Sequence, residues 1–310
     1  MSSDGPIGYI ERTRSYYEAL GHAPYLWAHF ADVPFARLRR PLSQCSVALV
    51  TTAAPFNPAK GEQGPGAPYN AAAKFFQVYS GPSASDPDLR ISHIAIDRAH
   101  TTAEDKNSYF PLDALRRALE RDRIGRIAAR FHGLPTNRSQ RTTIDADCIQ
   151  LVRRVQEDEA DAVILVPNCP VCHQSCTLAA RALEQAGIVT VVMGAALDIV
   201  EHVGVPRFLF SDVPLGNSAG RPNDQDSQER ILAMALDLLE KAGGPRTTWH
   251  SGLTWSDDPS WKLDYCNVAR LSAEEIGRRR AEHAEIREVA KRIQGRETDL
   301  STNSRIRRSI

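Results

Sequence analysis

Short aliphatic runs alternate with helix-forming segments in the second half of the chain, and this alternation decides the fold class. Residues 162–166 and 189–193 have the unbroken apolar character of strands that are buried on both faces. Between them, residues 178–186 predict a helix that ends at Gly187. A strand, a helix and a second strand in this order form a right-handed crossover between parallel strands. The sequence therefore predicts an α/β protein whose parallel sheet is covered by helices on both faces.

The same alternation continues on either side of this unit. Further strands are expected at residues 47–51, 89–97, 127–131 and 207–210, and further helices at residues 9–40, 111–125, 144–159, 196–203 and 228–242. The tryptophan-rich residues 245–267 are expected to be irregular. Ser272 and Glu275 then form a capping box that predicts the start of a long, charged C-terminal helix.

A similarity between stretches of the two halves of the sequence indicates two lobes. The stretches "VALVTTAAPFNP" and "VILVPNCPVCHQ" each place a strand ahead of a loop that contains Thr or Cys. We therefore expect two Rossmann-like lobes, each with a parallel sheet, whose loops meet at a shared cleft. The expected organisation is an N-terminal helical segment at 1–44, a first α/β lobe at 45–143, a second α/β lobe with the cysteine loop at 144–244, a tryptophan-rich segment and C-terminal helix at 245–294, and a disordered tail at 295–310.

Charge and hydropathy narrow the class of protein. The chain has 310 residues and a formal net charge of +0, which argues against nucleic acid or a membrane surface as a general partner. No apolar run approaches the roughly 18 residues of a membrane-spanning helix, and the N-terminus lacks the apolar region of a signal peptide. We expect a soluble cytoplasmic protein, in which clustered cysteines are catalytic or metal-binding rather than disulfide-bonded.

The stretch "VILVPNCPVCHQSC" places three of the six cysteines directly after a predicted strand. Ligands bind beyond the carboxyl ends of parallel strands, so Cys169 is expected to reach a cleft. The N-terminus of the following helix, near residues 171–175, should lower the pKa of its thiol and make it a nucleophile. Cys172 has the spacing of a redox partner, and His173 could act as an acid or a base.

Spacing alone leaves other interpretations of these cysteines open. They could be small buried residues without chemistry. A closed zinc knuckle is disfavoured, because it needs four ligands and the chain has no second CxxC pair. A catalytic zinc ion needs only three protein ligands, which Cys169 and the residues after it could share with His93, Asp97 or His132. Zinc is therefore the alternative cofactor, and no nucleotide motif indicates another.

Polar residues at other strand ends are candidate substrate contacts. Thr51 and Thr52 end the first predicted strand and could hydrogen-bond a carboxylate. His93 lies in "ISHIAID", where the alternation could turn its side chain into the cleft. Asn217 belongs to the loop "PLGNSAGRPND", which could close over a substrate. Each of these residues is equally compatible with a structural role.

Several stretches together carry a family resemblance. They are "VALVTTAAPF", "LRISHIAID" with "NSYFPLDALRRALERDRIGRIAARFHG", "DAVILVPNCPVCHQS" with "ALEQAGIVTVV", "FLFSDVPLGNSAGRPND" and "WKLDYCNVARLSAEEIGRRRAE". In these stretches the chain resembles the B components of the glycine, sarcosine and betaine reductases and of D-proline reductase. It is most similar to their short cysteine-containing relatives, described as the selenoprotein B reductase family. The stretches cover most of residues 45–285 in order.

The resemblance implies a two-lobed α/β fold that is distantly like the aspartate/glutamate racemases. It also implies a mechanism: in the reductases a selenocysteine, at the position that Cys169 matches, attacks a carbon that bears nitrogen. The C–N bond is then cleaved reductively, and partner thiols regenerate the enzyme. This chain has Cys at that position, and its "ISHIAID" and "EDKN" segments differ from the commoner family versions. These departures indicate a retained scaffold with a changed substrate.

The residues and the resemblance together predict an enzyme that cleaves a carbon–heteroatom bond in a small amino-acid-derived or heterocyclic molecule. The bond would be C–N, cleaved by reduction, or C–S, cleaved by desulfurisation, with Cys169, Cys172 and His173 as catalytic residues. The alternatives are a zinc-dependent desulfhydrase or hydrolase, a racemase-like enzyme, and a non-catalytic subunit of a reductase complex. The expected partners are the small substrate, a thiol reductant, and a second copy of the chain in a homo-oligomer.

Overall fold

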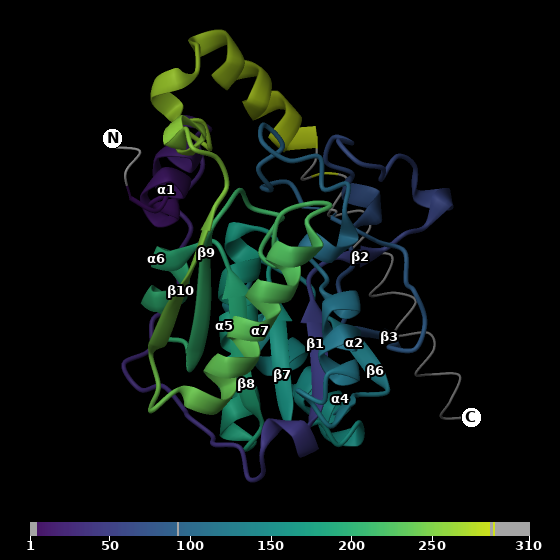
Figure 1. Ribbon diagram of the computed structural model, residues 1–310. Coiled ribbons are helices and arrows are strands. Elements are labelled where there is room, and N and C mark those ends of the chain that lie inside the picture. Colours follow the sequence, from purple (N-terminus) through teal and green to yellow (C-terminus); the bar gives the residue numbers. More distant parts are fainter. Residues whose placement is uncertain (1–4, 92, 286–287, 289–310) are drawn as a thin grey trace, which may run out of the picture.

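A mostly parallel sheet forms the centre of the protein (Figure 1). The computed structural model describes residues 5–91, 93–285 and 288, and within these ranges the sheet has eight strands. They are β1 (Ser46–Thr51), β3 (Tyr79–Pro82), β5 (Arg126–Ile127), β6 (Arg130–Gly133), β7 (Ala162–Val166), β8 (Val189–Gly194), β9 (Arg207–Asp212) and β10 (Thr247–Thr254). Their order is β10-β9-β8-β7-β1-β6-β3, and β5 pairs with the start of β1. Only β3, which pairs with β6, is antiparallel to its neighbour in this set.

Helices cover both faces of this sheet (Figure 1). The helices of the described part of the chain include α1 (Tyr9–Ala19), α2 (Leu112–Glu120), α3 (Gln140–Thr142), α4 (Ile149–Glu157), α5 (Pro170–Gln185), α6 (Leu197–Val203) and α7 (Gln225–Lys241). α2 and α7 pack against each other on one face, whereas α5 packs against α4 and α6 on the other. A π-helical segment, Thr143–Cys148, joins α3 to α4.

The predicted crossover unit is confirmed. β7, α5 and β8 follow one another, β7 and β8 are parallel neighbours, and every residue of both strands is buried. β7 is built mainly from aliphatic and β-branched residues, which suit a strand enclosed on both faces. The α/β class with a largely parallel sheet, which the sequence predicts, is therefore what the chain adopts.

The two halves share one sheet, which corrects the expectation of a separate sheet in each lobe. β1 pairs with β7 in parallel, from Val47 opposite Ala162 to Thr51 opposite Val166. β1 is buried along its whole length and needs a strand neighbour on each edge, because an unpaired buried backbone group is costly. Periodicity identifies such strands but does not say which of them pair. As a result, the carboxyl ends of β1 and β7 lie side by side.

Three segments differ from their expected secondary structure. The helix expected over 9–40 stops at the end of α1, because prolines interrupt the residues that follow. The strand expected over 89–97 is reduced to β4 (Leu89–Arg90), which pairs in an antiparallel manner with the short β2 (Ala54–Pro55). The segment expected to be irregular at 245–267 contains β10. This edge strand lacks a continuous apolar run because much of it is exposed.

α5 starts at Pro170, eight residues before the helix expected at 178–186 and one residue before the N-terminus expected near residues 171–175. Pro170 occupies its first turn, where a missing N–H costs nothing, and Cys169 is the capping residue before it. The whole cysteine motif after Cys169 is therefore helical. Almost all of α5 is buried, so its polar residues form no amphipathic pattern that marks residues 170–177 as helical.

The capping box predicted at Ser272 is confirmed. The Glu275 N–H donates to Ser272 Oγ at 3.2 Å, and the Ser272 N–H donates to Glu275 Oε2 at 2.8 Å. Residues 273–285 are helical, and Arg280 donates to the carbonyl of the last residue of α1. The tail expected to be disordered at 295–310 lies outside the described residues. Among the described helices, none combines the length and the apolar character that crossing a membrane requires.

A buried ion pair joins α5 to β9 and leads to a prediction about stability. Arg207 Nη1 lies 2.7 Å from Glu184 Oε1, and the two side chains are 1% and 0% exposed. In Arg207→Met the Glu184 carboxylate stays buried without its partner. We therefore expect the free energy of unfolding to fall by about 3–5 kcal/mol, measured by urea denaturation.

The matched control for this prediction is Arg153→Met, which removes an exposed pair between Arg153 and Glu157 on α4. Its expected cost is about 0.5 kcal/mol or less, because solvent screens exposed pairs. A loss below about 1 kcal/mol in Arg207→Met would contradict the prediction.

Candidate functional site

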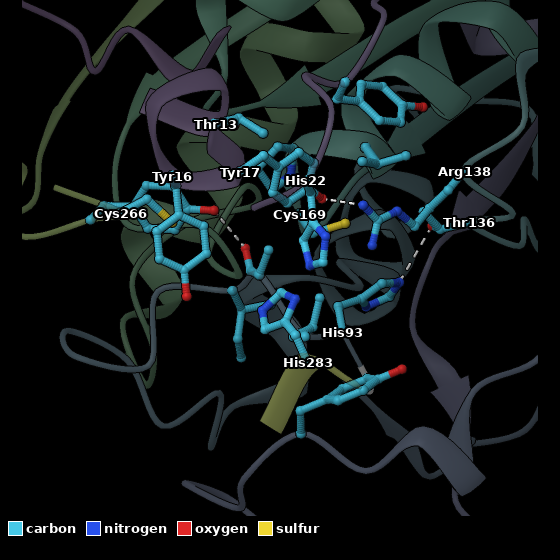
Figure 2. A pocket seen from close by; sticks show the side chains of 18 of the residues that line it. Thr13, Tyr16, Tyr17, His22, His93, Thr136, Arg138, Cys169, Cys266 and His283 are labelled. Atoms are coloured by element: carbon cyan, nitrogen blue, oxygen red, sulfur yellow. Dashed lines mark hydrogen bonds between the residues drawn. The ribbon is translucent and has the colours of Figure 1, made fainter. Parts of the chain in front are cut away.

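A cavity of about 1330 Å³ lies beyond the carboxyl ends of β6 and β7 (Figure 2). Thr136 and Cys169, from the loops after these two strands, line it. Its other walls come from α1 with residues 21–27, from residues 93–99, and from the C-terminal segment after β10. Ligands of parallel α/β sheets bind at this end of the strands, so the cavity is the candidate functional site.

Cys169 lies at the cavity wall at the start of α5. Its backbone is extended, and its Sγ accepts the backbone N–H of Cys172 at 3.3 Å, so the thiol itself caps the helix. Cys169 is 4% exposed, whereas Cys172 is 0% exposed and lies behind it. Of the two sulfurs, the Cys169 sulfur is therefore the one that a ligand in the cavity can reach.

His93 completes a compact group with the two cysteines. One ligand atom from each of His93, Cys169 and Cys172 lies within 4.8 Å of the others. Thr136 connects the group: its Oγ1 is 3.1 Å from Cys172 Sγ and 3.5 Å from His93 Nε2. Figure 2 shows His93 and Thr136 on the same side of Cys169. The sequence-predicted residues Cys169, Cys172 and His93 are thus brought together.

The two thiols have opposite pKa shifts. Burial raises the pKa of Cys169 well above its usual value, and the adjacent Cys172 raises it further. Burial also acts to raise the pKa of Cys172. The hydrogen bond with the Cys169 thiol and the interactions with His93 and Thr136 outweigh burial and lower that pKa well below its usual value. The shifts favour the thiolate on Cys172 over Cys169, whereas the sequence predicted the lowered pKa at Cys169.

His173 lies beneath the site and not in the cavity. Its Nδ1 donates to the Cys169 carbonyl at 2.8 Å, and its Nε2 accepts the Ala195 N–H at 2.9 Å. Burial lowers the pKa of His173 to about 4, so the ring is neutral at neutral pH. The ring packs so closely on Gly194 that an added Cβ there would lie 2.6 Å from Nε2. These contacts make His173 a support for the cysteine turn and leave neither nitrogen free for proton transfer.

Thr52 also supports the cysteine loop and does not line the cavity. Its Oγ1 accepts the backbone N–H of Asn168 at 3.1 Å and the side-chain Nδ2–H of the same residue at 3.0 Å. Thr51 Oγ1 accepts the Ala53 N–H at 3.1 Å within the turn after β1. Both threonines are completely buried. They hold the chain at the end of β1, as expected of strand-end caps, and are not placed to touch a substrate.

Three other sequence-predicted residues lie outside the thiol group. His132, within β6, is 0% exposed and sits 3.0 Å from Asp158 Oδ2, with burial lowering its pKa to about 4. Asp97 lines the cavity but pairs with His100 at 3.0 Å. Asn217 is buried and donates to the Pro214 carbonyl at 3.1 Å. His132 and Asp97 therefore lie apart from the group of His93, Cys169 and Cys172, whose ligand atoms lie within 4.8 Å of one another.

Several cavity residues were not predicted from the sequence. Tyr25 and Trp27 pack against Cys169 and Cys172, with their own ring centroids 4.6 Å apart. Gln174 of α5 holds this segment in place, because its Nε2 donates to the Tyr25 hydroxyl at 2.8 Å. Lys74 and Arg138 also line the cavity. These four cavity residues lie in segments without periodic structure, so only their aromatic or basic character distinguishes them in the sequence.

The donor set of the thiol group suits a zinc ion. Zinc prefers thiolate and imidazole ligands, and three protein ligands leave one coordination position open. His93 Nδ1 is buried without a hydrogen-bond partner among the described residues, which is unusual for a polar atom. His93, Cys169 and Cys172 are therefore the residues that could hold a metal here.

Comparisons with known proteins find two curated relatives. The chain is 30% identical over 200 residues to D-proline reductase subunit gamma of Acetoanaerobium sticklandii, covering 64% of this chain and 79% of that protein. It is 25% identical over 224 residues to glycine reductase complex component B subunit gamma of Symbiobacterium thermophilum, covering 69% of this chain and 51% of that protein. The chain thus spans about half the length of the second relative.

No family model matches the chain, and no solved structure matches it. The distant likeness to aspartate/glutamate racemases, which the resemblance implies, therefore stays a prediction.

The joint between Thr52 and Asn168 leads to a prediction about the thiol pair. Thr52→Val keeps the shape of the side chain but leaves two buried N–H groups of Asn168 without an acceptor. We expect the free energy of unfolding to fall by about 1–3 kcal/mol. We also expect faster iodoacetamide labelling of Cys169, because the loop that carries it loses its anchor. Urea denaturation and peptide mass spectrometry measure the two effects.

Thr177→Val is the matched control. Thr177 is buried on α5, and its hydroxyl donates to a carbonyl inside the same helix at 2.8 Å, so no buried N–H loses its acceptor. Equal labelling of Cys169 in the Thr52→Val and Thr177→Val proteins would show that the joint does not position the thiol.

Proposed function

Because the chain belongs to the reductase component B family, we propose that it cleaves a carbon–heteroatom bond reductively, with Cys169 and Cys172 as the source of the two electrons. The observation that carries this proposal is the pair of sulfurs, one bordering the cavity and one directly behind it. The bond is C–N or C–S, and C–N is consistent with relatives that are named as reductases of D-proline and glycine. The substrate is a small amino-acid-derived or heterocyclic molecule.

In the first proposed step, Cys169 attacks the carbon that bears the heteroatom. A C–S bond forms as the carbon–heteroatom bond breaks, and the Cys169 proton passes to the Cys172 thiolate. The leaving amine or sulfide needs a proton, and protonated His93, beside both sulfurs, donates it. The low pKa of Cys172 supports this step, because a thiolate next to a thiol can accept its proton during attack.

In the second proposed step, neutral His93 takes the proton from Cys172. The Cys172 thiolate attacks the Cys169 sulfur, a disulfide forms, and the C–S bond breaks. The electron pair stays on carbon, which takes the proton from His93. The products are the reduced carbon compound, the protonated leaving group and a Cys169–Cys172 disulfide. An external dithiol, the expected thiol reductant, must then reduce this disulfide.

The first test counts thiols in the reduced protein after incubation with D-proline, glycine, thiazolidine-4-carboxylate or the aromatic amino acid phenylglycine, without added reductant. With a substrate, we expect the six cysteine thiols of the chain to fall by two. Peptide mapping should then find a Cys169–Cys172 disulfide. Cys172→Ser lacks both the base of the first step and the resolving thiol. It should therefore form a thioether on Cys169 more slowly and stop there, and intact mass spectrometry would detect the added fragment.

Cys45→Ser is the control for this test. Cys45 is buried at the start of β1, at the other end of the strand from the site, and its thiol contacts the carbonyls of Arg40 and Pro41. Its variant should react like the unmodified chain apart from the missing thiol. Thiol loss that persists in Cys169→Ser would contradict the mechanism. Reaction of the purified chain would also rule out the purely non-catalytic subunit.

A zinc-dependent desulfhydrase or hydrolase is the second candidate function. Two observations favour it: one ring nitrogen of His93 lies within 4.8 Å of both sulfurs, and its buried Nδ1 has no hydrogen-bond partner among the described residues. His93, Cys169 and Cys172 would hold the ion, which when bound would supply a Lewis acid for water or for a departing sulfide. In that function the aromatic cover of Tyr25 and Trp27 would exclude bulk water from the bound substrate.

Metal analysis of the reduced protein separates the two functions. If zinc is the cofactor, we expect near-stoichiometric zinc after equilibrium dialysis, and its loss in Cys169→Ser, Cys172→Ser and His93→Gln. Removal of a ligand typically costs far more affinity than removal of a remote side chain, so Cys45→Ser should retain the ion. Dialysed protein without zinc, or zinc that survives Cys169→Ser, would exclude this metal site.

A further inference from the structure

Two cationic side chains line the cavity near Cys169. Lys74 is half-buried, and its ammonium group lies 4.9 Å from the centroid of Phe76. Arg138 is exposed at the cavity wall, donates to the Tyr17 hydroxyl, and has its guanidinium carbon 5.2 Å from the Tyr17 ring centroid. Figure 2 shows Arg138 and Tyr17 joined on the side of the cavity that holds Cys169.

Neither cation has a carboxylate partner among the described residues. Burial lowers the pKa of Lys74, and the charge of Arg138 lowers it further, whereas Cys169 and Cys172 act in the opposite direction without reversing the shift. The two positive charges therefore repel each other across the same space. The acidic residues of the cavity do not neutralise them. Asp97 and Asp264 both contact His100, at 3.0 and 3.2 Å. An anionic group bound between Lys74 and Arg138 would relieve this repulsion.

The remainder of this wall is aromatic. Tyr17, Tyr25, Trp27 and Tyr69 line the cavity, and Tyr25 and Trp27 cover the sulfurs. The cavity volume of about 1330 Å³ exceeds the range of about 300–1,000 Å³ that is usual for small-ligand pockets. A single aliphatic amino acid would fill only part of it. Flat rings pack favourably against Tyr and Trp, by edge or face.

We propose that the substrate carries an anionic group, held between Arg138 and Lys74, on an aromatic or heteroaromatic body that packs against Tyr17, Tyr25 and Trp27. This inference rests on the proposed function, since it places the reacting carbon of that molecule beside Cys169. Arg138 and Lys74 are then specificity-determining residues, and the substrate is larger and flatter than an aliphatic amino acid.

The test compares three probes of one skeleton with the reduced full chain by isothermal titration calorimetry. Naphthalene-2-carboxylate has the ring and the charge, naphthalene-2-carboxamide has the ring alone, and decahydronaphthalene-2-carboxylate has the charge without aromaticity. We expect the carboxylate to bind about 10- to 100-fold more tightly than the carboxamide, as charge-assisted hydrogen bonds predict. Loss of aromaticity should weaken binding by about 3- to 10-fold.

Variants of Arg138 and Lys74 test whether these two cations bind the carboxylate. Arg138→Gln and Lys74→Gln should each weaken the naphthalene carboxylate by about 10-fold or more and leave the carboxamide unchanged. Arg138→Lys should bind within a few-fold of the unmodified chain. Arg153→Gln, an exposed change on α4, is the matched control and should bind normally. Thermal unfolding of each variant confirms that it folds.

Equal affinity for carboxylate and carboxamide, or unchanged affinity in both Gln variants, would overturn the anionic anchor. Equal affinity for the aromatic and the saturated carboxylate would overturn the aromatic body. The naphthalene probes carry no heteroatom leaving group, so their binding does not depend on thiol chemistry. A failure here alongside thiol loss in the earlier test would therefore reject this inference alone, and the reverse pattern would reject the proposed function alone.

Discussion

The hydrogen-bonded joint between Thr52 and Asn168 fixes the site, because it locks together the residues that follow two adjacent buried strands. Asn168 donates both its backbone N–H and its side-chain N–H to Thr52 Oγ1. The next residue, Cys169, is thereby set with extended backbone at the start of α5, where its sulfur receives the N–H of Cys172. The position of the sulfurs follows from the pairing of β1 with β7 and from this joint. No conformational preference of the cysteine loop itself is needed to explain where the sulfurs lie.

The elements that could be predicted are those whose own residues show a recognisable hydrophobic pattern. β1, β7 and β8 are continuous apolar runs, and their existence and limits followed from that pattern alone. The single sheet could not be predicted, because the choice of β7 as the neighbour of β1 depends on packing between distant parts of the chain. β10 was not predicted because its own residues lack the pattern of a buried strand. It is an edge strand, and its exposed polar residues resemble those of a loop.

In the site, too, the residues that could be predicted are those marked by their sequence neighbours, whereas residues that only the fold brings together could not. Cys169 was identifiable because a strand, a proline and a helix start surround it in sequence. His93 and His132 were indistinguishable in sequence, since each stands in a short apolar stretch. In the fold, His132 lies within β6 against Asp158, whereas His93 lies in a loop beside the sulfurs. Lys74 belongs to an irregular segment, and only the tertiary fold brings it to the cavity with Cys169.

The asymmetry of the thiol pair gives the proposed cycle its direction. Cys169 borders the cavity and Cys172 is fully buried, so a partner thiolate that reduces the disulfide must attack the Cys169 sulfur. Thiol–disulfide exchange is faster when the departing sulfur has the lower pKa, and Cys172 is that sulfur. Access from the cavity favours attack on the Cys169 sulfur, and leaving-group stability favours departure of the Cys172 sulfur. Both factors therefore favour the same direction of disulfide reduction. A zinc ion on these thiolates would block both attack and disulfide formation, so the metal-bound and the reductive functions cannot operate on one site at the same time.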